Sequence, residues 1–375
     1  MGDFINFISG ISEDMLPIGG VGGILGNTPD ILKNYEKTKI LYEKSSAKYL
    51  MVDSGGFQLF SINEDNMAIA DPSQRTLIIM NPDKSIHLKK RFNLCAEHVV
   101  MANQLLHPDF IVSPDLPVPD PADPDQRRYL FLNSFGYCIY GAFMMAELLA
   151  QTASKAKLLI PIQAFDLAEF QLYLNHLQHI HFDGLSFPRR IMTMERMAAF
   201  FIRAYLAGVR TIHVLGTGRF SYIAFIAFFA KNYFTFTSID STDLQKFSQV
   251  NSYLEPFSLR PISLRMDSQD DLRQPIKCNC PWCSYHSSFA AIQNLPKHEK
   301  RAFMVNHNHF VVEQLMTEAY EHATTARDLY EFLSEKTTRF DDCKNVYRVL
   351  SLVEAVRAHL SNESIIQAFY RKLGF

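Results

Sequence analysis

The sequence lacks an excess of positive charge, a long apolar run and a recognisable leader. Its 37 Lys and Arg residues against 39 Asp and Glu residues leave a net charge of −2, so no overall basic field attracts a polyanion. The apolar stretch at 140–150 is interrupted by Glu147 and is too short to cross a bilayer. Met1 to Phe7 contains an acid and no basic residue, unlike a secretory signal. We therefore expect a soluble, cytoplasmic protein with no membrane partner, in which any nucleic-acid contact depends on local basic residues.

The common glycine-rich nucleotide-binding motifs are also missing. Residues 16–24 are rich in glycine, but they lack the Lys-Ser/Thr ending of a phosphate-binding P-loop. No GxGxxG pattern follows the first apolar strand, which argues against an open dinucleotide-binding sheet. A fold with a different kind of ligand site is therefore favoured.

Short apolar runs alternate with helical segments through residue 239. We predict strands at 49–52, 110–112, 158–162, 182–188, 211–215 and 234–239. We predict helices at 85–105, 125–152, 167–177, 193–207 and 222–232. Strands and helices that alternate at this spacing form βα units around a parallel sheet. With 375 residues, the chain is long enough for an α/β fold of the TIM (β/α)8 barrel type, which we rank above an open doubly wound sheet.

Polar residues or glycines end the predicted strands, as expected at the catalytic mouth of a barrel. These residues are Asp53, Asp115, Gln163, Gly184, Gly216 and Asp240. The most distinctive stretch is Asp53-Ser54-Gly55-Gly56-Phe57-Gln58, whose glycines allow a flat ligand to approach the backbone closely. Taken alone, the stretch is equally explained by Asp53 capping a turn that the glycines serve.

Three of the six cysteines lie in one short run, Cys278-Asn279-Cys280-Pro281-Trp282-Cys283. So close a cluster in an intracellular chain indicates a metal site more than disulfides. One histidine would complete a closed tetrahedral site of the structural zinc type, and the candidates are His286, His298, His307 and His309. An iron–sulfur cluster is disfavoured because no fourth cysteine lies nearby. We expect His307 and His309 to open a helix at 310–320 that packs on the cysteines.

The Asp53 stretch, the cysteine run and His307-Asn308 ahead of Leu315-Met316 together resemble the tRNA-guanine transglycosylases. The resemblance extends over residues 51–316. It implies a TIM barrel with a zinc-bearing insertion near the C-terminal end of the barrel. It also implies an enzyme that exchanges guanine in a polynucleotide for a 7-deazaguanine base. The implied route passes through a covalent Asp–sugar ester, as in a retaining glycosidase.

The resemblance also implies roles for single residues. Asp240 corresponds to the nucleophile, with Asp243 as a nearby alternative, and Asp53 corresponds to the general acid and base. Asp115 and Gln163 correspond to the residues that read the edge of guanine. The whole implied base pocket comprises Ser54, Gly55, Gly56, Phe57, Asp115, Gln163, Gly184, Leu185, Leu215 and Gly216. The implied zinc ligands are Cys278, Cys280, Cys283 and His307.

The parts expected to face the polynucleotide depart from the bacterial tRNA enzymes. Those enzymes carry Pro-Thr-Arg shortly after the nucleophile, whereas residues 241–245 here contain no arginine. Their Gly-Gly-Leu-Ala-Val-Gly loop is replaced by a sequence that ends in Pro188-Arg189-Arg190. This pattern favours the DNA-modifying branch of the family, which inserts a preQ0-type base, with tRNA as the alternative acceptor. The basic residues expected near phosphates are Arg189, Arg190, Arg219, Lys231 and Arg260.

The resemblance allows two further interpretations of the chain. It could be a non-catalytic partner subunit, but the presence of both Asp53 and Asp240 argues against that. It could also form a homodimer or act with partner proteins. We predict three parts: most of the barrel with its mouth at 1–275, a zinc-binding subdomain at 276–316, and C-terminal helices at 317–375 that complete the barrel or pack on it.

Overall fold

A computed structural model describes most of the chain. It covers residues 2–9, 21–55, 68–71, 76–79, 96–118, 124–217, 219–241, 247, 250–256, 260–265, 272–336 and 340–375. Gly56 and Phe57 of the predicted base pocket, and the alternative nucleophile Asp243, lie outside these residues. Within the described part, no helix is long and apolar enough to cross a membrane.

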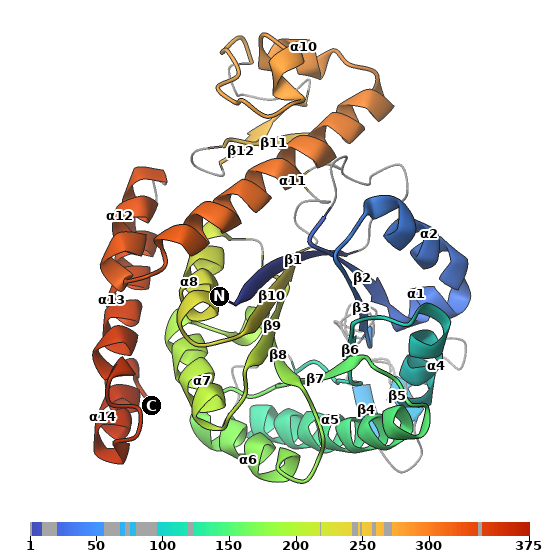
Figure 1. The fold of residues 1–375 in the computed structure, drawn as a ribbon, viewed down its shortest axis with the longest axis vertical. Coiled ribbons are helices and arrows are strands. Elements are labelled where there is room, and N and C mark those ends of the chain that lie inside the picture. Colours follow the sequence, from blue (N-terminus) through green and yellow to red (C-terminus); the bar gives the residue numbers. More distant parts are fainter. Residues whose placement is uncertain are drawn as a thin grey trace. The chain divides into compact units, whose positions relative to one another are not determined.

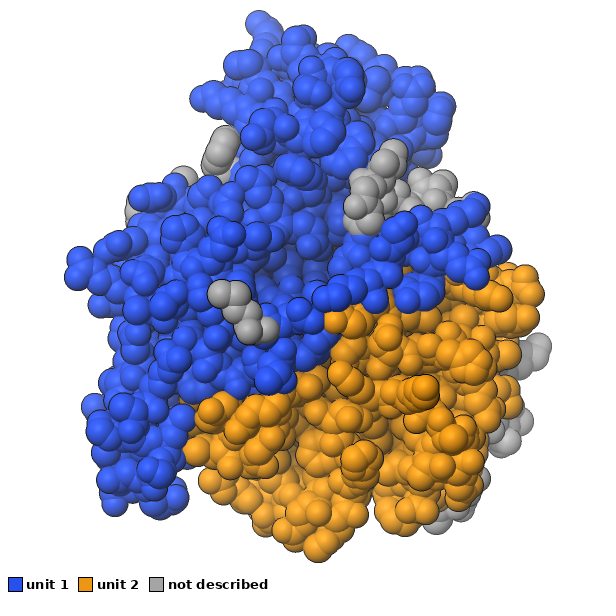
Figure 2. Space-filling model, in the orientation of Figure 1, with its two compact units in different colours: residues 1–22, 40–48, 216–374 blue, residues 23–39, 49–215, 375 orange. Residues whose placement is uncertain are grey.

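The chain divides into two compact units, which Figure 2 shows in different colours. Unit 1 comprises residues 1–22, 40–48 and 216–374, and unit 2 comprises residues 23–39, 49–215 and 375. The predicted division of the chain after residues 275 and 316 follows the motifs in the sequence and not the compactness of the fold. It stays a prediction.

Eight strands form a closed barrel in the order β1-β10-β9-β8-β7-β6-β3-β2 (Figure 1). Every pair of these strands whose register is described is parallel. The predicted TIM-type barrel is therefore confirmed. Its strands are β1 (Asp3–Ser9), β2 (Gly23–Asn27), β3 (Tyr49–Asp53), β6 (Phe110–Val112), β7 (Lys157–Pro161), β8 (Gly184–Pro188), β9 (Thr211–Leu215) and β10 (Phe236–Ser241).

The sequence analysis found six of these strands and missed β1 and β2. Strand β1 pairs with β10, and β2 pairs with β3 along its whole length. In β1 the polar residues Asp3 and Asn6 interrupt the apolar run, and in β2 two glycines resemble a loop. Gly26 is also closely packed, because a Cβ there would lie 3.0 Å from a methyl group of Thr38 and would have to push that side chain aside.

The direction of each side chain on β8 follows from its packing. Phe187 makes ring contacts with Phe170 of helix α6 (Leu167–Leu177) and with Phe201 of helix α7 (Met194–Leu206). Because side chains alternate along a strand, Ser186 and Pro188 face the opposite side, which is the barrel interior. The strand therefore ends with Pro188 facing the interior, and the polar residues Arg189 and Arg190 follow it.

Gly184 occupies the other end of β8. The prediction that it ends its strand was wrong, because it is the first residue of β8. A Cβ at this position would lie 2.5 Å from the carbonyl oxygen of Thr211 in β9, so the close approach of the two strands requires glycine.

The helices that follow the strands largely match their predictions. The helices predicted at 125–152, 167–177, 193–207 and 222–232 agree with α5, α6, α7 and α8 to within two residues at each end. The helix predicted at 85–105 is described only as α4, because residues 85–95 lie outside the described part. The bounds of the other elements up to residue 232 are α1 (Thr28–Lys33), α2 (Tyr35–Ser45), α4 (Ala96–Leu106), α5 (Pro124–Gln151) and α8 (Phe220–Asn232). Strands β4 (Ala68–Asp71) and β5 (Thr76–Ile79) form an antiparallel hairpin.

Two aspartates in unit 2 each join the amino ends of two neighbouring strands, β6 to β3 and β8 to β7. The Asp109 carboxylate accepts a hydrogen bond of 2.9 Å from the Leu50 N–H, and the Asp183 carboxylate accepts one of 2.8 Å from the Leu158 N–H. Both carboxylates satisfy backbone donors at the start of a strand, so their role is structural. They lie at the amino ends of the strands, whereas Asp53 and Asp115 follow the carboxyl ends of β3 and β6.

Unit 1 contains a second, smaller core beside its barrel strands. It forms between an antiparallel hairpin and a long helix, and its buried members include Tyr253, Cys280, Cys283 and Phe303. The prediction that His307 and His309 open a helix was wrong: both lie inside α11, which begins at Lys297 after Pro296. The elements here are β11 (Ser252–Leu254), β12 (Pro261–Ser263), η4 (Cys283–Tyr285), α10 (Phe289–Gln293) and α11 (Lys297–His322).

Residues 223–230 of helix α8 (Phe220–Asn232) are all apolar and buried because other elements of unit 1 surround them. The helix packs against β1, β10, α11, α12 and α13. A helix that is covered in this way has no polar face. The C-terminal helices are α12 (Ala326–Lys336), α13 (Phe340–Arg357) and α14 (Glu363–Leu373), drawn in orange-red and red in Figure 1.

A carboxyl group of α11 contacts the first barrel strand within unit 1. The buried Asn6 of β1 donates a hydrogen bond of 3.1 Å from its Nδ2 to Oε1 of Glu313. Burial raises the pKa of the Glu313 carboxyl to about 7, against the opposing effect of this hydrogen bond. The protonated form of Glu313 is therefore favoured by folding up to about neutral pH.

The Glu313→Gln variant tests this effect, since it keeps an acceptor for Asn6 but does not ionise. The folded-state pKa of Glu313 lies above the ordinary value of 4.5. The stabilising contribution is therefore complete below about pH 4.5 and is lost as pH rises through about 7. Above that pH we expect the variant to be the more stable protein, with a free energy of unfolding at most about 3 kcal/mol higher than that of the unmodified protein.

Urea unfolding at several pH values measures this difference. Glu321→Gln, which changes an exposed carboxylate on the same helix, is the control and should give a difference that varies little with pH. A stability difference for Glu313→Gln that stays constant from pH 4.5 to 8 would contradict the assignment.

Candidate active site and metal centre

Asp53 lies at the carboxyl end of β3, where the backbone turns sharply. Its Oδ2 accepts a hydrogen bond of 3.1 Å from the N–H of Gly55, and its carbonyl oxygen accepts one of 2.9 Å from the hydroxyl of Thr28. Gly55 has φ +86°, a left-handed conformation that favours glycine. The first glycine of the motif is thus required by the turn, and the turn holds a half-buried carboxylate at the strand end.

Asp115 is the buried carboxylate of the site in unit 2. Its two oxygens accept hydrogen bonds from the hydroxyl of Ser54 at 3.0 Å and from Nε2 of Gln163 at 2.7 Å. These partners come from the ends of β3 and β7, next to the end of β6 that carries Asp115. Burial raises the pKa of the Asp115 carboxyl, and the two hydrogen bonds and the charge of Arg190 oppose that shift.

The Gln163 amide has one atom whose hydrogen-bonding capacity is unused within the described residues. Its Nε2 donates to Asp115, but its buried Oε1 has no hydrogen-bond partner there. The hydroxyl of Ser186, on the interior side of β8, is also buried and unpartnered among the described residues. Buried polar atoms are nearly always hydrogen-bonded, so these atoms indicate a place for the polar edge of a ligand.

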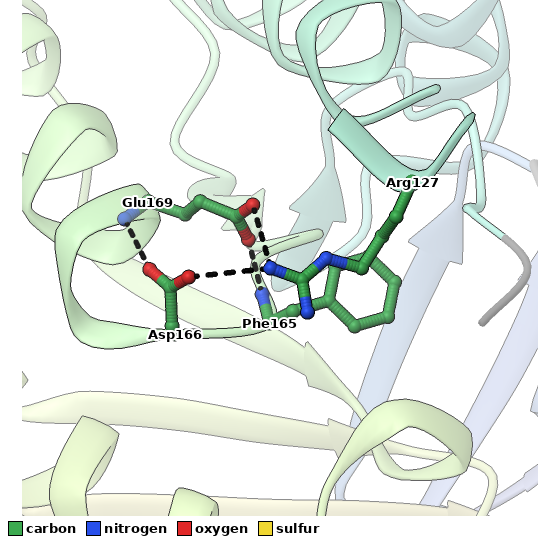
Figure 3. A network of polar contacts seen from close by, with 4 residues as sticks. All are labelled: Arg127, Phe165, Asp166 and Glu169. Atoms are coloured by element: carbon green, nitrogen blue, oxygen red, sulfur yellow. Dashed lines mark hydrogen bonds and ion pairs between the residues drawn. The ribbon is translucent and has the colours of Figure 1, made fainter. Parts of the chain in front are cut away.

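A polar network fixes the loop that carries Gln163, as Figure 3 shows. Asp166 caps α6 by accepting from the N–H of Glu169 at 2.9 Å, and Glu169 accepts in return from the N–H of Phe165 at 2.6 Å. Arg127 of α5 lies 3.5 Å from the Asp166 carboxylate and 3.8 Å from that of Glu169. This reciprocal capping holds the backbone two residues beyond Gln163.

Two guanidinium groups also contact the Phe165 ring. The Cζ atom of Arg127 lies 5.3 Å from the ring centroid, and that of Arg196 on α7 lies 5.7 Å from it. The Arg196 guanidinium additionally donates to the carbonyl oxygen of Ile191, just beyond β8. The ring of Phe165, in the loop after β7, is therefore connected through Arg196 to the residues that follow β8. No sequence pattern predicted this connection.

Arg190 lies at the same end of unit 2. Its Nη2 donates a hydrogen bond of 3.0 Å to the carbonyl oxygen of Val118, which is three residues beyond Asp115. The pKa of the Arg190 guanidinium is lowered by its partial burial and raised by the charge of Asp115. The sequence analysis expected Arg190 near phosphates, whereas its described contact joins the loops after β6 and β8.

Three more of the residues expected near phosphates belong to unit 1. Lys231, near the C-terminal end of α8, donates to the carbonyl oxygen of Glu321 and lies 5.6 Å from the Tyr320 ring centroid. Arg219 immediately precedes the other end of the same helix. Arg260 lies 4.0 Å from the Glu255 carboxylate.

Asp240 lies near the carboxyl end of β10 in unit 1. Its Oδ1 accepts a hydrogen bond of 2.8 Å from the N–H of Gly216, and its carbonyl oxygen accepts one of 2.8 Å from the N–H of Thr217. Gly216 has φ +74°, so the turn after β9 again favours glycine. The carboxylate is 8% exposed and is held by the backbone that follows Leu215.

The predicted site residues thus fall into three placements. In unit 2 the structure brings together Asp53, Ser54, Gly55, Asp115 and Gln163, and in unit 1 it brings together Asp240 and Gly216, which directly follows Leu215. Gly184 and Leu185 lie in the amino-terminal half of β8, away from the strand end that Asp115 and Gln163 share. The base-facing role implied for Gly184 and Leu185 therefore has no support from their position.

The four predicted metal ligands converge in the small core of unit 1. The Sγ atoms of Cys278, Cys280 and Cys283 and a ring nitrogen of His307 all lie within 4.8 Å of one another, so the group could hold a metal ion. The distances from His307 Nδ1 to the three sulfurs are 3.7, 3.5 and 3.3 Å. Sulfur and nitrogen ligands of tetrahedral zinc lie about 3.6 Å apart, so these residues fit such an ion.

Surrounding groups orient the ligands. His307 Nε2 lies 2.7 Å from the carbonyl oxygen of Leu254, so this nitrogen carries the proton and Nδ1 faces the sulfurs with its lone pair. The Tyr253 ring stacks on the imidazole at a centroid distance of 3.8 Å. Backbone N–H groups of Cys280 and Cys283 donate to Cys278 Sγ and Cys280 Sγ, respectively. Hydrogen bonds from the other two thiols lower the pKa of the Cys278 thiol.

Asn308, beside the histidine, fastens α11 to the hairpin. Its Oδ1 accepts from the Leu254 N–H and its Nδ2 donates to the Ser252 carbonyl oxygen, both at 2.9 Å. The side chain thus replaces a strand partner for β11. This explains structurally why His307 and Asn308 occur together in the sequence.

Comparison with known proteins adds one finding. Residues 8–342 match the family model described as queuine tRNA-ribosyltransferase. The matched range contains Asp53, Asp115 and Asp240 as well as the four clustered metal ligands. No curated protein sequence matches the chain.

The Cys280→Ser variant tests the metal centre. Cys280 is fully buried, and loss of its thiolate leaves three ligands and an oxygen that zinc binds less well. The unmodified protein should carry about one metal ion per chain. We expect the variant to lose most of this metal and to unfold at a lower temperature. Elemental analysis and thermal unfolding measure the two effects.

Cys343→Ser is the matched control, because Cys343 is a buried cysteine of α13 outside the cluster. It should keep the metal content unchanged. Full metal content in Cys280→Ser would remove Cys280 from the ligand set.

Proposed function

The chain belongs to the queuine tRNA-ribosyltransferase family, a family of pentosyltransferases, and we propose that it exchanges guanine in DNA for a preQ0-type 7-deazaguanine. The family membership supports guanine transglycosylase activity on nucleic acid. The identity of the acceptor and of the incoming base is our inference from the residues.

The observation that carries the proposal is the buried Asp115 with Ser54 and Gln163. A guanine edge carries N–H donors beside one carbonyl acceptor, and a carboxylate and an amide are matching partners. Gln163 Oε1, which lacks a partner among the described residues, is an acceptor for such a donor. Because the base cannot be reached within a stack, the target nucleotide must be flipped out of its strand.

We assign the first half of the reaction to Asp240 and Asp53. A carboxylate oxygen of Asp240 forms a bond to C1′ of the nucleoside while the bond from C1′ to N9 of guanine breaks. Asp53 gives a proton to the departing base, so guanine leaves neutral and the sugar remains as an ester on Asp240. The hydrogen bond from the Gly216 N–H orients the attacking carboxylate.

The second half reverses these steps with a different base. The 7-deazaguanine occupies the pocket that guanine has left, and its N9–H proton passes to Asp53. The N9 atom then forms a bond to C1′ while the ester bond to Asp240 breaks. Two displacements at one carbon restore the original stereochemistry, and no other reactant is consumed.

This mechanism requires Asp53 and Asp240 to act on one nucleotide. The closed barrel order supports this requirement, because the carboxyl ends of barrel strands meet at a common mouth. The amino-end carboxylates Asp109 and Asp183, which bind backbone N–H groups, are excluded by the same argument.

We propose zinc as the ion of the Cys278, Cys280, Cys283 and His307 group. Three thiolates and one imidazole form a closed set without a free coordination position, which is typical of structural zinc. Such an ion would hold the cysteine segment at 278–283 against α11. It has no part in the displacement chemistry.

DNA is favoured over tRNA because of the sequence that follows the nucleophile and the end of β8. Residues 241–245 contain no arginine, and β8 ends at Pro188 and is followed by Arg189-Arg190 in place of a glycine-rich loop. A tRNA acceptor is the second candidate, since it is the acceptor in the family's description. A non-catalytic subunit is disfavoured because both aspartates are kept at strand ends.

Asp240→Asn is expected to abolish the covalent intermediate. An amide is a poor nucleophile at C1′, so exchange should fall by at least about a thousandfold. Denaturing gel electrophoresis of enzyme with polynucleotide measures the adduct, which should appear for the unmodified protein only. Adduct formation by Asp240→Asn at the normal rate would assign the nucleophile to another residue.

Asp53→Asn is expected to abolish exchange while preserving the fold. The amide still accepts the Gly55 N–H, so the turn is kept, but it cannot transfer the proton between base and carboxylate. Exchange of labelled guanine and thermal unfolding are the two measurements. Normal exchange in this variant would overturn the acid–base role.

The acceptor is tested by exchange of labelled guanine into tRNA and into duplex DNA in parallel. Label in DNA alone is the expected result. Label in tRNA alone would make the chain a tRNA enzyme despite the missing arginine. Label in neither would favour the partner-subunit interpretation or a requirement for another protein.

A further inference from the structure

Arg190 supplies a cationic donor next to the proposed base-reading group. It belongs to the short helix η3 (Arg189–Ile191), which directly follows the end of β8. The residue as a whole is exposed while its guanidinium is part-buried, and the hydrogen bond to the Val118 carbonyl oxygen holds the guanidinium at the loop that begins with Asp115. The charges of Arg190 and Asp115 influence each other, which agrees with this proximity.

Among the described residues at this position, two groups cannot serve as donors to a base. Gln163 Nε2 already donates to Asp115, and Pro188 at the end of β8 has no N–H group. Gly184, whose backbone was expected to face the base carbonyl, lies at the opposite end of the strand. A carbonyl acceptor on the ligand would therefore meet the guanidinium of Arg190.

The chemistry of the incoming base gives this contact a consequence. Beyond the N–H groups that Asp115 can accept from, the next groups along a 7-deazaguanine edge are O6 and the 7-substituent. Arginine donors are well suited to this pair of positions, as their frequent contacts with O6 and N7 of guanine show. The nitrile of preQ0 is a neutral acceptor, whereas the aminomethyl group of preQ1 is a cation that a guanidinium repels.

We propose that Arg190 is a specificity-determining residue that selects a 7-deazaguanine with a neutral acceptor at position 7 over one with a cationic substituent. The inference rests on the proposed function, because it assumes that Asp115 binds the base. It changes the role of Arg190 from a phosphate contact to a base contact.

The test compares preQ0 and preQ1 as incoming bases in the full-length protein. The unmodified protein should prefer preQ0 in kcat/KM. Arg190→Gln removes the charge and should lower the preQ0-to-preQ1 ratio by roughly tenfold or more. Arg190→Glu should reverse the preference, an outcome that a merely structural role for the arginine would not produce.

Arg189→Gln is the matched control. Arg189 is the preceding residue, and its described hydrogen bond is a long one of 3.5 Å to the Met192 carbonyl oxygen. The ratio of kcat/KM for preQ0 to kcat/KM for preQ1 in Arg189→Gln should equal that of the unmodified protein. An unchanged ratio in Arg190→Glu would overturn the proposal. So would a defect confined to the KM of the polynucleotide, which would make Arg190 a phosphate contact.

Direct binding of the two bases separates this inference from the proposed function. Calorimetry with preQ0 and preQ1 measures base selection without any exchange. If guanine exchange fails in both nucleic acids but binding favours preQ0 and Arg190→Glu reverses it, the proposed reaction is wrong and the specificity role stands. If exchange succeeds and the preQ0-to-preQ1 ratio does not depend on residue 190, the proposed reaction stands and the specificity role of Arg190 is wrong.

Discussion

The alternation of side chains along parallel strands is the constraint on which the candidate site depends. On β8, Phe187 packs against helices, so Ser186 and Pro188 face the barrel interior. On β10, the register with β1 pairs Asp240 with Phe7, and a shift of one residue would turn the carboxylate to the other side. The first strand of the chain, which has little sequence signal, therefore helps to fix the direction of the proposed nucleophile, together with the hydrogen bond from the Gly216 N–H.

Asp115 differs from the two structural aspartates of unit 2 in the kind of partner that it binds. Asp109 and Asp183 bind backbone N–H groups at the amino ends of strands, and these donors cannot turn away from them. Asp115 binds a serine hydroxyl and a glutamine amide, whose rotors can reorient when a ligand arrives. A buried carboxylate that is held by movable donors is stable without ligand and can still exchange its partners for the edge of a base.

Several parts of this arrangement could be predicted from the sequence, and each has a local cause. The strands β3, β6, β7, β8, β9 and β10 are apolar runs bounded by turn residues, and their alternation with helices predicts the barrel. The cysteine spacing indicates a metal site because thiolates so close together need a common partner. Among the candidate histidines, the sequence alone could not select His307, since the ligand is chosen by the packing of α11 on the hairpin.

The parts that failed depend on contacts between distant segments. Strands β1 and β2 are recognised only through their pairing with β10 and β3. Gly184 was misassigned because glycine beside leucine also occurs at ligand-facing loops, whereas here the close approach of β9 requires it. The network of Arg127, Phe165, Asp166 and Glu169 joins two helices and a loop, and no single segment contains its pattern.

Basic residues are the clearest case in which charge in the sequence does not give the function. Lys231 donates to a backbone carbonyl and lies near an aromatic ring, and Arg196 and Arg190 join loops by binding the carbonyl oxygens of Ile191 and Val118. A guanidinium has five donors, so one arginine can close a loop and still present donors to a ligand. The selection of a nucleic acid in this protein therefore cannot be inferred from a count of basic residues. For Arg190 the proposed role is the selection of the incoming base, and its hydrogen bond to the Val118 carbonyl oxygen holds it at the loop that begins with Asp115.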